Sequence, residues 1–131
     1  MPRPPASPRR SVLIVDRSQD SREVLRTALE RRGLLIFEAP AARQGLEIAR
    51  LQLPNVIVLD LETSAAEEHA VCGQYAAHLN SQHSSLVILG TLRCDEVPPQ
   101  SHVVATPYHY GPLIRTIEQL IQRSAADECQ V

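Results

Sequence analysis

Two stretches of the sequence decide the fold: VLIVD at residues 12–16 and VIVLD at residues 56–60. Each is an unbroken run of four apolar residues, several of them β-branched, and each ends in an aspartate. Short continuous apolar runs of this kind are typical of parallel strands that are buried on both faces of a sheet. The sequence therefore predicts two interior strands with Asp16 and Asp60 at their carboxyl ends.

Further strands and helices alternate with these two runs along the chain. Additional strands are predicted at residues 34–39, 86–89 and 103–105. Helices are predicted after residue 20, within residues 40–53 and 66–80, and from about residue 112. Alternating strands and helices indicate an α/β protein with a doubly wound parallel sheet. The flavodoxin-like strand order 2-1-3-4-5 is one of the two common arrangements for such a sheet, and we expect it here.

The ends of the predicted helices are marked by local signals. Asp20 and Glu23 have the spacing of a capping box, which predicts the start of the first helix. Gly33 is a natural stop for that helix, and Pro54 ends the second one. Pro112 is suited to the first turn of the last helix.

The connection between the fourth and fifth strands is unusual for a parallel sheet. Such connections normally contain a helix, but Pro98 and Pro99 lie in the middle of residues 92–102. Proline lacks the backbone N–H and restricts the residue before it, so a continuous helix cannot form there. We therefore expect the fourth helix of the fold to be shortened or absent.

The bulk properties indicate one compact domain. The chain has 131 residues, a net charge of −2 and 44% hydrophobic residues, and its apolar runs are far shorter than the roughly 20 residues of a membrane helix. We expect a disordered, Pro- and Arg-rich tail at residues 1–10, a domain at residues 11–124, and a C-terminal tail at residues 125–131. The three cysteines are widely spaced, which favours free thiols in a cytoplasmic protein.

A candidate site lies where the predicted strands end. Open α/β sheets bind ligands at the carboxyl ends of their strands, and the first and third strands are neighbours in the expected order. Asp16 and Asp60 should therefore lie close together, with Thr91 at the end of the fourth strand and Thr106-Pro107 at the end of the fifth. Two carboxylates at this edge would favour a hard cation such as Mg²⁺, or would leave one carboxylate as a nucleophile.

This pattern resembles the receiver domains of bacterial two-component response regulators over residues 11–124. The resemblance implies that Asp60 is the phosphoacceptor for a histidine kinase and that Asp16 is the first of two acids that hold Mg²⁺. It also implies that Thr91 contacts the phosphoryl group. In that family a Lys followed by a cis-Pro ends the fifth strand, so we expect a cis bond between Thr106 and Pro107.

Two positions depart from the receiver pattern. Arg17 stands in place of the second acid, and Thr106 stands in place of the Lys. All 13 basic residues are Arg, so no neighbouring Lys can substitute. A change from acid to Arg alters the local charge by two units, and one charge pair at 4 Å is worth about 4 kcal/mol near a protein surface. The predicted Mg²⁺ site, formed by Asp16 and Asp60, is therefore weak. The Arg17 side chain either pairs with one of these carboxylates or points to solvent.

Three functions are compatible with the sequence. The first is a stand-alone, degenerate pseudo-receiver that is not an enzyme, needs no cofactor and signals by binding a protein, namely a histidine kinase, a downstream signalling protein or a second copy. The second is a working receiver that is phosphorylated on Asp60. The third is a flavin or nucleotide enzyme, which is disfavoured because the loop at residues 17–20 is not glycine-rich and Trp is absent. Neither nucleic acid nor membrane is an expected partner, since the net charge is small and no helix pair remains for reading DNA.

Overall fold

In the computed structural model the described residues are 10–60, 73–75, 77, 85–89, 101–104 and 109–129. The strands are β1 (Ser11–Val15), β2 (Leu35–Ala39), β3 (Val56–Asp60), β4 (Ser85–Leu89) and β5 (Ser101–Val104). The helices are α1 (Gln19–Glu30), α2 (Ala42–Gln52) and α4 (Tyr110–Cys129). Residues 73–75 and 77 are also helical, within the region where the sequence predicts a helix.

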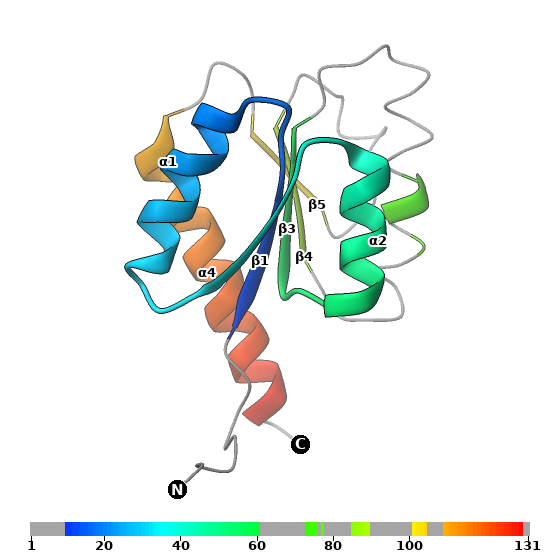
Figure 1. Ribbon diagram of the computed structural model, residues 1–131. Helices are drawn as coiled ribbons and strands as arrows, with labels where there is room; N and C mark the ends of the chain where they lie inside the picture. Colours follow the sequence, from blue (N-terminus) through cyan, green and yellow to red (C-terminus); the bar gives the residue numbers. More distant parts are fainter. Residues whose placement is uncertain are drawn as a thin grey trace, which may run out of the picture.

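The strands form one parallel sheet with the order β2-β1-β3-β4-β5, which confirms the predicted flavodoxin-like topology (Figure 1). The apolar residues of β1 and β3 are almost fully buried, as expected for strands that are covered on both faces. β1 pairs with both β2 and β3, and its register against β3 matches Val15 with Leu59. This register brings the carboxyl ends of β1 and β3 to the same edge of the sheet.

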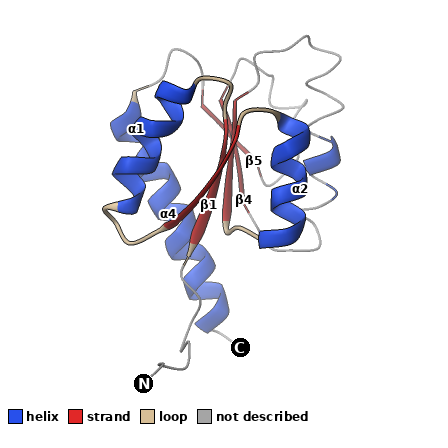
Figure 2. Cartoon of the chain, in the orientation of Figure 1, coloured by secondary structure: helices blue, strands red, loops and turns tan. Residues whose placement is uncertain are grey.

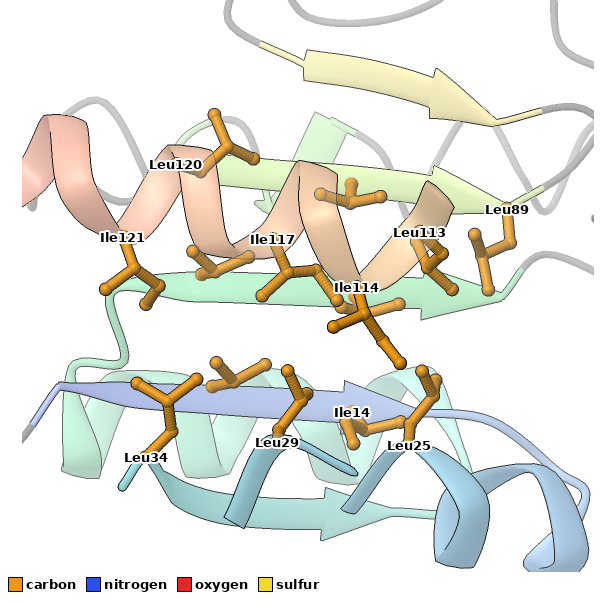
Figure 3. Close-up of a cluster of buried hydrophobic side chains, with 14 residues drawn as sticks. Ile14, Leu25, Leu29, Leu34, Leu89, Leu113, Ile114, Ile117, Leu120 and Ile121 are labelled. Carbon is orange, nitrogen blue, oxygen red and sulfur yellow. The ribbon is translucent and has the colours of Figure 1, made fainter. Parts of the chain in front are cut away.

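Helices cover both faces of the sheet, so the core has two parts (Figure 2). On one face, α1 and α4 pack against alternate strand residues; Figure 3 shows Leu25 and Leu29 of α1 together with Leu113 and Ile117 of α4. On the other face, α2 and Tyr75 pack against the remaining strand residues. The period-two alternation of each buried strand supplies both parts of the core.

The first helix begins earlier than the predicted capping box. Ser18 is its N-cap, and its Oγ accepts a hydrogen bond from the backbone N of Ser21 at 3.2 Å. The capping-box prediction for Asp20 and Glu23 is therefore wrong: a serine hydroxyl already satisfies a free N–H of the first turn, and Asp20 lies inside the helix. Gly33 has a φ of 82° and lies just beyond the end of α1, in agreement with its predicted role.

Replacement of the cap should be measurable. Ser18→Ala removes the acceptor for the Ser21 N–H and should lower the free energy of unfolding by about 1 kcal/mol. Ser18→Asn is the matched control, because asparagine caps helices about as well as serine and should keep the stability. Urea unfolding followed by circular dichroism would give both values. Equal losses in the two variants would show that the cap hydrogen bond is unimportant.

The last helix is longer than the sequence predicts. α4 runs from Tyr110 to Cys129, so residues 125–129 continue the helix instead of forming a tail. Ala125, Ala126 and Glu128 favour helix, and neither glycine nor proline interrupts this stretch. The end of α4 extends past the lower end of the sheet in the view of Figure 1.

Several predictions concern residues outside the described ones. The expected disorder of residues 1–10 falls almost wholly there, and so do most of the shortened fourth-helix region and the Thr106–Pro107 bond. These expectations stay predictions. Within the described part of the chain, none of the helices combines the length and apolar character that a bilayer span requires.

Candidate functional site

Asp16 follows β1 directly and is almost completely buried, with 3% of its surface exposed. Its backbone N donates to the carbonyl oxygen of Ala39 at 3.0 Å, which ties it to the end of β2. Its Oδ1 accepts from the backbone N of Ser18 at 2.9 Å. Its Oδ2 is buried and has no hydrogen-bond partner within the described part of the chain. Leaving a buried carboxylate oxygen without a partner is costly, so this atom is available for a ligand.

Asp60 is the last residue of β3 and is half-buried. Val15 of β1 pairs with Leu59 of β3. Asp16 follows Val15 and Asp60 follows Leu59, so the two aspartates lie at the ends of adjacent strands. Adjacent strands are about 4.8 Å apart. The structure therefore brings the two predicted carboxylate residues to the same edge of the sheet.

Arg17 is exposed, and within the described residues it makes no hydrogen bond or ion pair. Of the two placements considered from the sequence, the structure shows the one in which the guanidinium points to solvent. The positive charge nevertheless belongs to the residue next to Asp16.

Two arginines of α1 are directed to β2. Arg26 Nη1 lies 2.6 Å from Glu38 Oε2, and Arg22 Nε lies 3.9 Å from Glu38 Oε1. The hydrogen bond from Arg26 to Glu38 raises the pKa of the Arg26 guanidinium. Glu38 therefore accepts a hydrogen bond from Arg26, whereas the Nε of Arg22 is buried without a hydrogen-bond partner within the described part of the chain.

The remaining predicted site residues, Thr91 and Thr106, lie outside the described residues. β3 pairs with β4 so that Asp60 lies opposite Leu89, two positions before Thr91 in the sequence. The expectation that Thr91 approaches Asp60 agrees with this register but stays a prediction. So does the assignment of Thr106 to the Lys position.

The described residues offer part of a Mg²⁺ site. The buried, unpartnered Oδ2 of Asp16 is a suitable oxygen ligand, and the neighbouring Asp60 could provide another. No cluster of three His, Cys, Asp or Glu side chains suited to a metal occurs among the described residues. A bound Mg²⁺ would neutralise negative charge on a phosphoryl group, while Asp16 and Asp60 would hold it.

A contact beside the site was not predicted from the sequence. Tyr75 is fully buried, and its hydroxyl donates to the carbonyl oxygen of Ala42 at 2.7 Å. Burial raises the pKa of Tyr75, so the phenol stays protonated and remains a donor. A Cβ added to Gly45 would lie 2.5 Å from the Tyr75 hydroxyl and 2.5 Å from Val15 Cγ2. A glycine inside an otherwise regular helix was the available signal for this close approach.

Comparison with known proteins gives a match to part of the sequence, whereas the solved structures match the fold. No protein-family model matches the chain. A stretch of 51 residues is 47% identical to the KDP operon transcriptional regulatory protein KdpE of Escherichia coli strain K12, and it covers 39% of this chain and 23% of that protein. The match therefore spans less than a quarter of that longer protein.

Solved structures match over most of the chain. The chemotaxis protein CheY4 of Vibrio cholerae has a TM-score of 0.69 at 20% identity, covering 86% of this chain and 99% of that one. The signal receiver domain of a DNA-binding response regulator protein from Colwellia psychrerythraea has a TM-score of 0.70 at 20% identity, covering 86% and 98%. At these identities the likeness establishes the fold. The chain thus has the α/β fold of response-regulator receiver domains.

Proposed function

We propose that this chain is a receiver-like module of two-component phosphorelay signalling that acts by binding a protein partner and accepts phosphoryl groups poorly at Asp60. The observation that carries this proposal is the acidic edge itself. Asp16 and Asp60 lie at the ends of adjacent strands, as a phosphoacceptor site needs, and Arg17, which is exposed, follows Asp16 where the resemblance to receiver domains implies a second acid. The chain also contains no Lys.

The expected chemistry explains why these departures matter. In phosphoryl transfer, a carboxylate oxygen of Asp60 would form a bond to phosphorus while the bond from phosphorus to the leaving group breaks. Such reactions are catalysed almost wholly by positioning and by neutralising charge on the transferring group. Asp16 can contribute a cation ligand, but Arg17 weakens the attraction for a divalent cation. Thr106 would bring a hydroxyl without a charge.

The proposed output is therefore a binding surface whose shape does not require phosphorylation. Its partner would be a histidine kinase or a downstream signalling protein, encountered in the cytoplasm. The similarity to a stretch of a transcriptional regulatory protein supports a place in bacterial signalling. A second copy of the chain is a further candidate partner.

One observation favours the alternative of a working phosphoacceptor. The Oδ2 of Asp16 is buried and has no hydrogen-bond partner within the described part of the chain, as a cation ligand would be before its cation binds. If Thr91 also lies beside Asp60, three elements of the site are retained. The alternative is therefore a receiver that tolerates Arg17 and Thr106.

A phosphorylation assay separates the two functions. Incubated with acetyl phosphate and Mg²⁺, the unmodified protein should stay mostly unphosphorylated, because the charge on the transferring group is not neutralised. Intact-mass spectrometry would measure the fraction that carries one phosphoryl group, with Asp60→Asn as the matched control. A large fraction in the unmodified protein that disappears in Asp60→Asn would establish the working phosphoacceptor instead.

A further inference from the structure

One close packing contact near the acidic edge involves a residue that no part of the proposed chemistry uses. Tyr75 is fully buried, and its hydroxyl donates to the carbonyl oxygen of Ala42, the first residue of α2. A tyrosine that served only to fill the core would not need a hydroxyl at this position. The hydrogen bond instead ties the helical residues around Tyr75 to the amino end of α2.

The Tyr75 hydroxyl also packs closely against Gly45 of α2, which in turn packs against Val15 of β1. A Cβ on Gly45 would collide with both the Tyr75 hydroxyl and Val15 Cγ2, at 2.5 Å from each. Distances below 3.0 Å are not tolerated between such atoms without movement, so α2 approaches β1 this closely only because residue 45 is glycine. Consequently, the positions of α2, Tyr75 and Val15 depend on one another.

Asp16 is linked to Tyr75, Gly45 and Val15 in two ways: by its peptide bond to Val15 and by its backbone hydrogen bond to Ala39. Val15 precedes Asp16 directly in the chain and packs beneath Gly45. The Asp16 amide donates to Ala39, and the chain continues from Ala39 into the first turn of α2, where the Tyr75 hydroxyl binds. A shift of the amino end of α2 would therefore move Asp16 along with it.

We propose that Tyr75 is a positioning residue for Asp16, acting through Ala42, Gly45 and Val15. This inference rests on the proposed function, because it names the residue that holds Asp16 in place at the same acidic edge. The hydroxyl holds α2 against the end of β1 and so fixes the carboxylate whose Oδ2 is open to a ligand. Without the hydroxyl, the core remains filled but the edge loses its support.

The test is amide hydrogen exchange, measured by NMR under native conditions. Tyr75→Phe keeps the ring and removes the hydrogen bond. We expect the Asp16 and Ser18 amides to exchange about fivefold faster, relative to the amide of Val87 in the middle of β4. This factor corresponds to the stability lost with one hydrogen bond. Gly45→Ala, which forces the hydroxyl to move, should accelerate the same amides.

Asn55→Ala is the matched control. Asn55 Oδ1 accepts from the Ser11 backbone N at 2.9 Å, at the opposite edge of the sheet. This variant should lower global stability without a selective effect on Asp16 and Ser18. If Tyr75→Phe gives the same uniform acceleration as Asn55→Ala, or none, Tyr75 has no positioning role and the inference is overturned.

A cation titration connects this result to the site. Mn²⁺ is the probe, and selective broadening of the Asp16, Arg17 and Ser18 amide signals reports its binding. The Mn²⁺ midpoint should rise several-fold in Tyr75→Phe and stay unchanged in Asn55→Ala. If the unmodified protein shows no selective broadening, the alternative of a working phosphoacceptor loses its support, while hydrogen exchange still decides the role of Tyr75.

Discussion

Replacing Arg17 with Asp and Thr106 with Lys in one variant should increase the affinity for Mg²⁺ at least tenfold and create a beryllofluoride site at Asp60. The first substitution changes the charge beside Asp16 by two units. One charge pair at about 4 Å is worth about 4 kcal/mol near a protein surface, whereas a tenfold change requires only about 1.4 kcal/mol. The Lys would supply the second positive charge that phosphoryl transfer needs.

The single variants separate the two contributions. Arg17→Asp alone should restore Mg²⁺ binding without stable beryllofluoride binding, and Thr106→Lys alone should restore neither. Titration calorimetry would measure the Mg²⁺ affinity, and fluorine NMR would detect the bound beryllofluoride. Adding Asp60→Asn to the double variant should abolish that signal. A double variant that binds neither ligand would mean that the receiver alignment of Arg17 and Thr106 is wrong.

The second large effect concerns the core under α2. Leu46→Ala should lower the free energy of unfolding by about 2–5 kcal/mol, because Leu46 is 6% exposed and its truncation leaves a cavity against the sheet. Leu51→Ala is the same chemical change in the same helix at a residue that is 79% exposed. Its effect should stay within about 0.5 kcal/mol.

Urea unfolding of both variants would test this difference. The slope of the unfolding free energy against urea should be equal in the two proteins, so that the midpoints can be compared directly. Similar losses for Leu46→Ala and Leu51→Ala would imply that the exposed end of α2 is covered by another surface in solution.

The interior of the sheet could be predicted from the sequence because its signal is strong and local. Four apolar residues followed by Asp, once at residues 12–16 and again at residues 56–60, leave few options other than buried parallel strands. Right-handed crossovers restrict the topology further, and the observed strand order follows. The same reasoning brought Asp16 and Asp60 to one edge.

Helix ends were harder to predict, since several residues compete for the same role. Ser18 and Asp20 are both good caps, and only the folded backbone shows that Ser18 is used. Likewise, Ala126 and Glu128 favour helix without marking where it stops, and α4 continues to Cys129. These choices depend on backbone geometry that residue types leave open.

The surroundings of the acidic edge were the least predictable part. Tyr75 lies in the helix predicted within residues 66–80, but that prediction could not reveal that its hydroxyl reaches Ala42. Gly45 lies in a predicted helix, and the sequence alone does not show that its missing Cβ permits the approach of Val15. Contacts between side chains that are distant in sequence arise from packing, which single-residue preferences do not encode.

The parts of the core on the two faces of the sheet can be completed at different stages of protein synthesis. Domains fold as the chain emerges, beginning from the amino end. Among the residues that the structure describes, the part of the core beneath α2 contains none later than Ile88. The part beneath α1 includes Leu113, Ile117 and Ile121 of the last helix. A nascent chain would therefore leave the apolar face of α1 uncovered until α4 has left the ribosome, which makes this face the one that a chaperone would meet.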